Sequence, residues 1–196
     1  MDKTLDYYDR IAEEFAADTR DADVGELHAL FLSHLPAGGR ILDLGCGSGR
    51  DSRLFRDNGY EVVAVDGSRE FCKIASSLIG QEVLCRTFEE LDFEEEFDGV
   101  WACASILHVP SERLPGVIAR ISRALKRGGF FYASFKYGVF EGERNGRYFT
   151  DLDEAGFAEL IAAFPEFEIV ETRITSDVRP GRAEEKWLNV VVRKID

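Results

Sequence analysis

The stretch "ILDLGCGSGRDS", residues 41–52, decides the fold, because an apolar run gives way there to glycines at positions 45, 47 and 49. A short apolar run followed by a glycine turn and a helical pattern is typical of a buried strand that leads into a helix. In an α/β sheet such a turn lets the backbone approach a ligand closely. The neighbouring residues are therefore needed to identify the ligand that this turn binds.

The segments around this stretch alternate between strand and helix patterns. Apolar, β-branched runs predict strands over residues 40–44, 60–66, 82–86, 97–103 and 128–136. Amphipathic periodicity predicts helices over residues 4–18, 24–35, 50–59, 68–79 (with Ser68 as N-cap), 111–125 and 151–164. This order predicts a doubly wound, mostly parallel sheet with helices on both faces, of the Rossmann-like kind.

The C-terminal segment departs from this order. Residues 167–178 and 185–195 are two long strand-like runs, and only "RPGRAE" separates their ends. A parallel connection needs a crossover of a dozen or more residues, so these two strands should pair antiparallel. The complete prediction is a seven-stranded α/β sheet that ends in an antiparallel hairpin.

Three kinds of ligand compete for the glycine turn. A phosphate loop needs G-x-x-x-x-G-K-[ST], and no lysine follows these glycines. A dinucleotide fingerprint needs G-x-G-x-x-G, but Arg50 stands where the third glycine is expected. The remaining interpretation is a nucleoside without a pyrophosphate.

Two carboxylates support a nucleoside ligand. Asp66 ends the second strand, 21 residues after Gly45, where an acidic residue can accept both hydroxyls of a ribose. Asp43 lies at the junction of the first strand and the turn, where it can hold an amino group directly or through water. A ligand with a ribose, an ammonium group and no phosphate is S-adenosylmethionine.

With these residues in view, the sequence resembles the class I S-adenosylmethionine-dependent methyltransferases over roughly residues 5–195. "ILDLGCGSGRDS" (41–52) resembles their first motif and "VVAVDGS" (62–68) their second. "FDGVWACASILHVP" (97–110) and "RALKRGGFFYASFK" (123–136) are similar to their fourth and fifth strands. "YYDRIAEEFAADT" (7–19) looks like the N-terminal helix that covers the cofactor in the small-molecule branch.

Within that branch, the chain is similar to tellurite-resistance type methyltransferases. The stretches "GCGSGRDS" (45–52) and "ADTRDADVGEL" (17–27) carry this similarity.

The resemblance implies a set of cofactor-binding residues and one departure from the family pattern. The set is Tyr8, Thr19, Asp43, Gly45, Cys46, Gly47, Arg50, Asp51, Asp66, Gly67, Ser68, Thr87, Phe88 and Ser105. Thr87 stands where the family often has an aspartate that accepts the adenine amino group. Glu89 is a candidate replacement for that carboxylate, or else a surface residue at a helix start. Cys46 has no nearby base, so a nucleophilic role is not expected.

Residues that follow the fourth and fifth strands are candidates for the acceptor side. His108 is a candidate general base, and the alternative is a packed histidine that shapes the pocket. The long connection over residues 137–150 is predicted as a loop over the active face, or as a solvated loop with two aromatic residues in the core. Its basic residues Arg144 and Arg147, with Lys136 before them, suit an anionic acceptor.

Composition bounds the partners. The formal net charge is −13, which disfavours nucleic acid as a substrate. The four cysteines and three histidines show no spacing typical of a metal site, so no metal is expected. No secretion signal or membrane-spanning run is visible, so we expect a cytoplasmic protein. We expect one domain over residues 1–196, with a helical lid (1–36) and an acceptor-side loop (137–150), and the sequence leaves the oligomeric state open.

The function predicted from these features is methyl transfer to a small molecule, with an anionic or metalloid acceptor as one form. The acceptor and the sulfonium must be held in line at about 3 Å, so positioning supplies much of the rate. Two alternatives stay open: a non-catalytic adenosylmethionine-binding protein, and a methyltransferase that acts on a protein or a tRNA.

Overall fold

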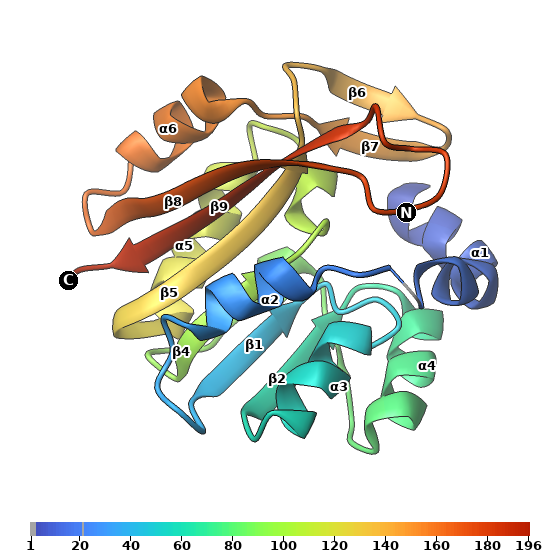
Figure 1. Ribbon diagram of the computed structural model, residues 1–196, viewed down its shortest axis with the longest axis horizontal. Helices are drawn as coiled ribbons and strands as arrows, with labels where there is room; N and C mark the ends of the chain where they lie inside the picture. Colours follow the sequence, from blue (N-terminus) through green and yellow to red (C-terminus); the bar gives the residue numbers. More distant parts are fainter. Residues whose placement is uncertain (1–2, 21) are drawn as a thin grey trace.

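The computed structural model describes residues 3–20 and 22–196, so Met1, Asp2 and Asp21 of the predicted lid lie outside the described residues. A seven-stranded sheet with the order β3-β2-β1-β4-β5-β9-β8 forms the centre of the molecule (Figure 1). The strands are β1 (Arg40–Leu44), β2 (Glu61–Asp66), β3 (Leu84–Cys85), β4 (Phe97–Ala102), β5 (Leu125–Lys136), β8 (Phe167–Ser176) and β9 (Lys186–Lys194).

The direction of the strands is as predicted. Strands β1 to β5 pair in parallel, whereas β9 pairs antiparallel with both β5 and β8. Strand order reverses beside β1, between β2 and β4, and this is the point where ligands bind in doubly wound sheets. The prediction of a Rossmann-like sheet with an antiparallel C-terminal hairpin is therefore confirmed.

Helices cover both faces of the sheet because successive strand residues point to opposite sides. The helices are α1 (Lys3–Thr19), α2 (Gly25–Leu32), α3 (Arg50–Asp57), α4 (Arg69–Ile79), α5 (Leu114–Ala124) and α6 (Glu154–Ala162). On one face, Leu42 and Val100 pack in a core that includes Ile118 of α5 and Phe157 of α6. On the other face, Ile41 and Trp101 pack in a core with residues of α2 and α3, and α4 packs beside them.

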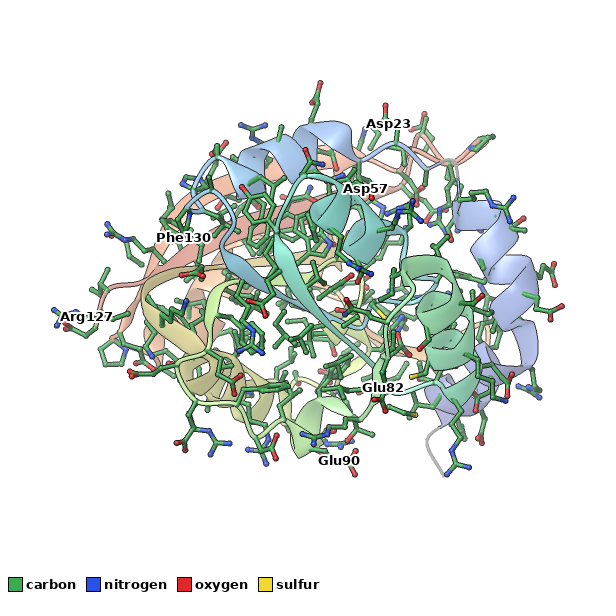
Figure 2. All side chains as sticks on the ribbon, turned by 90° about the horizontal axis from the view of Figure 1, so that it is seen from below. Asp23, Asp57, Glu82, Glu90, Arg127 and Phe130 are labelled. Carbon is green, nitrogen blue, oxygen red and sulfur yellow. The ribbon has the colours of Figure 1, made fainter. Side chains whose placement is uncertain are left out.

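Charged side chains lie at the outside of this layered arrangement. Asp57, Glu90 and Arg127 are exposed, and Figure 2 shows Glu90 and Arg127 at the edge of the molecule. Within the described part of the chain, no helix combines the length and the apolar character that a membrane crossing requires.

Two predicted segments differ in the structure. The connection over residues 137–150, predicted as a loop, contains a separate hairpin of β6 (Glu141–Arg144) and β7 (Arg147–Thr150). The fifth strand begins at Leu125 instead of residue 128, because Leu125 pairs with Phe97 across an irregularity in the register. Two short 3-10 helices, η1 (Phe88–Glu90) and η2 (Ile106–His108), follow β3 and β4.

Candidate functional site

A cleft of about 1260 Å³ opens at the carboxyl ends of the parallel strands. Single-ligand pockets typically measure roughly 300–1000 Å³, so this cleft has room for two small molecules. Of the residues predicted from the sequence for the cofactor and the acceptor, all except Ser68 are among the described residues that line it. The fold thus brings together positions that lie up to 139 residues apart, such as Tyr8 and Arg147.

The glycine turn is held against the end of β2. The N–H groups of Gly45 and Cys46 donate to the Val65 carbonyl at 2.8 and 3.0 Å. Gly45 has φ of +78°, and a Cβ at this position would lie 2.4 Å from the Cβ of Ser105. Only glycine fits there, because both the backbone conformation and the neighbouring side chain exclude a larger residue. The hydroxyl of Ser105 donates to the Leu44 carbonyl at 2.6 Å and so ties the segment after β4 to the turn.

Asp66 joins the turn to the start of α4. Its carboxylate accepts the N–H of Gly47 at 2.8 Å and the N–H of Ser68 at 2.8 Å, one on each oxygen. Each oxygen keeps a further lone pair for a ligand. Burial raises the pKa of Asp66 to about 6, although the two N–H groups oppose the shift.

Asp43 is the second buried carboxylate of the turn. It accepts the Ser52 hydroxyl at 2.6 Å, and no lysine or arginine of the described chain lies within salt-bridge distance of it or of Asp66. Burial, and next the nearby Asp51 carboxylate, raise the pKa of Asp43. Two buried carboxylates without a cationic partner make this end of the cleft suited to a cation.

Asp51 and Arg50 are structural supports of the turn. The Asp51 carboxylate accepts Arg50 Nε at 2.8 Å, Trp101 Nε1 at 2.9 Å and, in the tautomer that donates, His28 Nε2 at 3.1 Å. Burial opposes ionisation of Asp51, but the bond from His28 and the charge of Arg50 outweigh it and lower its pKa. Asp51 is thus already occupied by protein donors, and its contact with the cofactor stays a prediction.

Helix α1 closes one side of the cleft through contacts at its C-terminal end and near its middle. Arg50 Nη1 donates to the carbonyls of Thr19 and Ala22 at 2.9 and 3.1 Å, which ties the end of α1 to the turn. Asp9 accepts the hydroxyl of Ser68 at 2.6 Å. Ser68 caps α4 as predicted, accepting the Phe71 N–H, but its hydroxyl is held by Asp9 and does not line the cleft. Its predicted contact with the cofactor is therefore not supported by its position.

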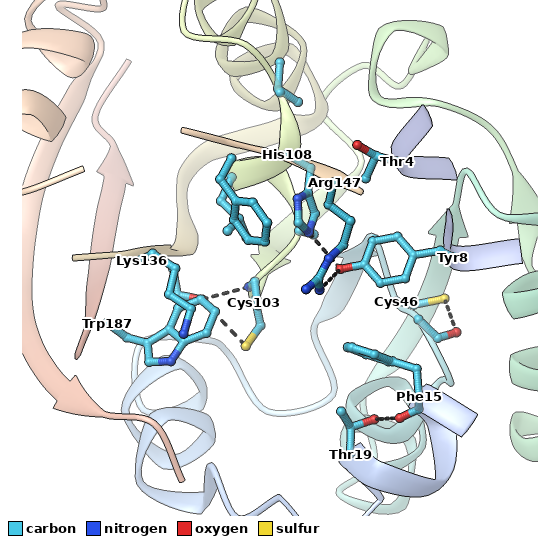
Figure 3. A pocket seen from close by; sticks show the side chains of 18 of the residues that line it. Thr4, Tyr8, Phe15, Thr19, Cys46, Cys103, His108, Lys136, Arg147 and Trp187 are labelled. Atoms are coloured by element: carbon cyan, nitrogen blue, oxygen red, sulfur yellow. Dashed lines mark hydrogen bonds between the residues drawn. The ribbon is translucent and has the colours of Figure 1, made fainter. Parts of the chain in front are cut away.

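A directed chain of hydrogen bonds runs from the β6–β7 hairpin to η2 (Figure 3). The His108 Nδ1 lies 2.6 Å from the Tyr148 carbonyl oxygen, which can only accept, so Nδ1 carries the proton. In the neutral ring, Nε2 is then the acceptor and receives the Tyr8 hydroxyl at 2.8 Å. Arg147 Nη1 in turn donates to the Tyr8 oxygen at 3.2 Å.

The other predicted acceptor residues are paired with carboxylates. Lys136 Nζ lies 3.2 Å from Asp177 Oδ2, forms an ion pair with Glu185, and sits 4.2 Å from the centroid of the Trp187 ring. Arg144 forms an ion pair with Asp151. Both cations line the cleft, but each is already neutralised within the protein.

The segment after β3 lines the opposite side. Thr87 and Phe88 border the cleft, and Thr87 starts η1 in a capping box with Glu90. Glu89 also borders the cleft and forms an ion pair with Arg113, so both of its predicted roles stay open. Cys46 is buried, and burial raises the pKa of its thiol well above the usual value, consistent with no nucleophilic role.

Comparison with known proteins supports a methyltransferase. A family profile described as "Methyltransferase domain" matches residues 42–133, which hold the glycine turn, Asp66 and η2. The structure of 1,6-didemethyltoxoflavin-N1-methyltransferase from Burkholderia thailandensis, with S-adenosylhomocysteine bound, superposes with a TM-score of 0.74 and 26% identity, covering 97% of this chain and 90% of that chain. In its family profile and in its fold, the chain is similar to the class I S-adenosylmethionine-dependent methyltransferases.

The curated relatives of this chain include methyltransferases that are named for different substrates. A "tRNA (carboxymethyluridine(34)-5-O)-methyltransferase" of Arabidopsis thaliana is 38% identical over 125 residues, which are 63% of this chain and 30% of that protein. A "Ubiquinone biosynthesis O-methyltransferase" of Xanthomonas axonopodis pv. citri is 30% identical over 152 residues, 67% of this chain and 63% of that protein. The chain thus spans less than two thirds of the length of these curated relatives.

One side of the cleft was not predicted from the sequence. The turn between β8 and β9 borders it with Asp177, Arg179 and Glu185, and Trp187 and Asn189 of β9 face it as well. These positions carry no local motif, because they reach the cleft only through the antiparallel return of β9 beside β5. The hairpin of β6 and β7 did carry a signal, since Asn145–Gly146 is the dipeptide that two-residue hairpin turns favour.

Proposed function

We propose that this protein transfers a methyl group from S-adenosylmethionine to a small-molecule acceptor. The observation that carries the proposal is the charge at the glycine turn, where Asp43 and Asp66 are buried and lack a cationic partner. A ligand that brings a ribose and positive charge fits these groups. When bound, S-adenosylmethionine supplies a methyl group that its sulfonium has activated for direct displacement.

In this proposal, some residues of the chain would hold the cofactor and others would exclude water from it. Asp66 would accept the ribose hydroxyls on the lone pairs that its backbone partners leave, and Asp43 would face the amino group directly or through water. Phe88 and the backbone of Thr87 would border the adenine. Helix α1, held by Arg50 and Asp9, would exclude water from the site.

His108 is the proposed general base for an acceptor that must lose a proton. Its Nε2 is the proton-accepting nitrogen and faces the cleft through the Tyr8 hydroxyl. A proton from the acceptor would move to the Tyr8 oxygen while the Tyr8 proton moves to His108 Nε2, which leaves Tyr8 unchanged. An acceptor that is already ionised needs no such step.

An experiment with labelled S-adenosylmethionine tests this proposal. The protein is incubated with the labelled donor and a panel of phenols, carboxylates, thiols and metalloid oxyanions, and transfer of label to at least one of them is expected. The metalloid oxyanion belongs in the panel because the stretches 45–52 and 17–27 resemble tellurite-resistance type enzymes. If S-adenosylhomocysteine binds but no panel member accepts label, a non-catalytic binding protein is the better interpretation.

A second candidate function is methylation of a nucleoside within tRNA. The 38% identity to the Arabidopsis thaliana tRNA methyltransferase favours it, whereas the net charge of −13 opposes binding to a polyanion. Binding of bulk tRNA that weakens steeply between 50 and 200 mM salt, measured by filter retention, would support this candidate.

A further inference from the structure

The positive charges of the cleft are almost all neutralised within the protein. Eight lysine and arginine side chains line it, and seven of these lie within salt-bridge distance of a carboxylate in the described chain. Arg147 is the eighth, and none of the residues that the structure describes gives it a carboxylate partner. Its charge is therefore the one that an incoming molecule can neutralise.

The surroundings of Arg147 are aromatic. Its guanidinium carbon lies 4.9 Å from the centroid of the Tyr7 ring and 5.1 Å from that of Phe149. Its one hydrogen bond within the described chain goes to the Tyr8 hydroxyl, and its Nε is buried without a partner there (Figure 3). A guanidinium has five N–H donors, and leaving buried donors unpaired is costly. A guanidinium with an unpaired buried donor in a cleft indicates a ligand that accepts hydrogen bonds from it.

The chemistry of a guanidinium limits what this ligand can be. Its planar fork matches the two oxygens of a carboxylate or of a similar oxyanion, and such charge-assisted pairs are about twice as strong as neutral hydrogen bonds. Tyr8, Phe149 and Trp187 border the same cleft and offer flat apolar faces. We propose, resting on the methyl-transfer function above, that the acceptor is a small planar molecule with a carboxylate or similar oxyanion, and that Arg147 binds this group.

The methionine part of the cofactor also carries a carboxylate that a guanidinium can bind. The position of Arg147 therefore has to decide whether it binds this carboxylate or the anionic group of the acceptor. Arg147 lies on β7 and reaches His108, after β4, through Tyr8. The carboxylates of the glycine turn belong instead to β1 and β2, and Arg50 stands beside that turn. This placement favours the acceptor as the anion that Arg147 binds.

The test compares anions with neutral molecules of the same shape. Protein saturated with S-adenosylhomocysteine is titrated by calorimetry with hydroxybenzoates, each paired with its methyl ester. We expect at least one carboxylate to bind the wild-type protein tighter than its ester, and Arg147→Met to weaken that carboxylate at least tenfold while the ester changes less than twofold. Arg147→Lys should fall between, because it keeps the charge and loses the fork.

Arg127→Met is the matched control. It also removes an arginine, but Arg127 is exposed and pairs with Asp196 away from the cleft (Figure 2). We expect no change in any affinity for this variant. Thermal unfolding of unliganded Arg147→Met checks its folding, and the midpoint should equal or exceed that of the wild type, because an unpaired buried donor is removed.

The outcomes separate this inference from the proposed function. If no carboxylate in the panel binds wild-type protein more tightly than its ester, the inference is wrong, although methyl transfer can still be correct. If Arg147→Met weakens S-adenosylhomocysteine instead, Arg147 holds the carboxylate of the cofactor and the inference is again wrong. If S-adenosylhomocysteine does not bind the wild type at all, it is the proposed function that fails.

Discussion

Asp66 serves two purposes at the scale of a single residue. It holds the backbone of the glycine turn and of the α4 start, and it presents its remaining lone pairs to the cleft. The turn and the ligand site therefore depend on the same carboxylate. A substitution here should change affinity more than one at a residue that only lines the cleft.

Asp66→Asn should lower the affinity for S-adenosylhomocysteine at least tenfold. An asparagine keeps the size but replaces an accepting oxygen by a donating amide, and hydrogen bonds to charged groups contribute about 1.5–3 kcal/mol. Calorimetric titration at pH 7.5 measures the change. The matched control is Asp57→Asn, at an exposed carboxylate of α3 paired with Arg53, and equal losses in the two variants would contradict the assignment.

The raised pKa of Asp66 predicts a pH dependence of binding. Between its ordinary value of 3.8 and about 6, the folded protein holds a proton that the unfolded chain has released, so Asp66 lowers the free energy of unfolding as pH rises through this window. A ligand that needs the ionised carboxylate should bind more weakly below pH 6, by up to about tenfold per pH unit. The affinity for S-adenosylhomocysteine measured from pH 7.5 to 5 tests this, and the Asp66 part of the slope should vanish in Asp66→Asn.

At the scale of elements, the β6–β7 hairpin positions Arg147 over the cleft. Its turn residues Asn145 and Gly146 both have positive φ, 49° and 80°, as two-residue hairpin turns require. Gly146 also lies against α1, since a Cβ there would approach the Tyr7 ring to 3.1 Å. The turn of the hairpin is therefore packed against helix α1.

Gly146→Ala should disturb the β6–β7 hairpin more than the glycine turn, which is held by Asp66 at the other end of the cleft. An alanine in the left-handed conformation lowers the free energy of unfolding by roughly 1–2 kcal/mol. We therefore expect faster amide hydrogen exchange over residues 141–150 and weaker binding of the hydroxybenzoate that the wild type prefers to its ester. Affinity for S-adenosylhomocysteine should stay within twofold. Gly59→Ala is the control, because Gly59 has φ of +87° with open space around its Cβ position, outside the residues that line the cleft.

The attachment of α1 predicts a second effect at this scale. Arg50→Met removes the hydrogen bonds to the carbonyls of Thr19 and Ala22, so the end of α1 should open more often. Amide exchange near residues 15–19 should quicken severalfold in the unliganded protein and slow again when S-adenosylhomocysteine is added. Arg53→Met, on the same helix but in an exposed pair with Asp57, should leave this exchange unchanged, and an equal effect in both variants would rule out the attachment.

The sequence predicted the elements whose patterns lie within a short stretch of the chain. The buried strands and amphipathic helices show their periodicity within ten or so residues, and Asp43 and Asp66 follow from their spacing to the turn. The hairpin was missed because its apolar residues do not alternate clearly over four-residue strands. The pairing of Lys136 with Asp177 and Glu185 depends on distant strands meeting, which no local pattern reports.

At the scale of the whole molecule, the cleft is polarised. Asp43 and Asp66 lie without cations at the end formed by β1 and β2, while Arg147 lies without a carboxylate at the end formed by β7. A positively charged donor and a negatively charged acceptor would each neutralise the group that faces them. Because the molecule has a net charge of −13, the local charge at Arg147 has to act against the field of the rest.

Binding of the donor product should stabilise the entire fold, because the cleft joins α1, the sheet and both hairpins. At a concentration 100 times the dissociation constant, a ligand adds about 2.7 kcal/mol to the free energy of unfolding. For a domain of this size that corresponds to a rise of roughly 5–10 °C in the unfolding midpoint. Differential scanning fluorimetry with S-adenosylhomocysteine measures it, and an unchanged midpoint up to millimolar ligand would contradict the assigned cofactor.

The two tryptophans of the chain allow binding in the cleft to be followed by intrinsic fluorescence. Trp101 is fully buried and stacked on Tyr132, with ring centroids 3.9 Å apart, so its emission should stay blue and constant. Trp187 is half-buried at the cleft wall under the Lys136 ammonium, where an arriving aromatic ring would change its polarity. The intrinsic fluorescence of the unlabelled protein should therefore change when the acceptor binds beside Trp187, while the emission of Trp101 stays constant. A Trp187→Phe variant identifies the emission that responds.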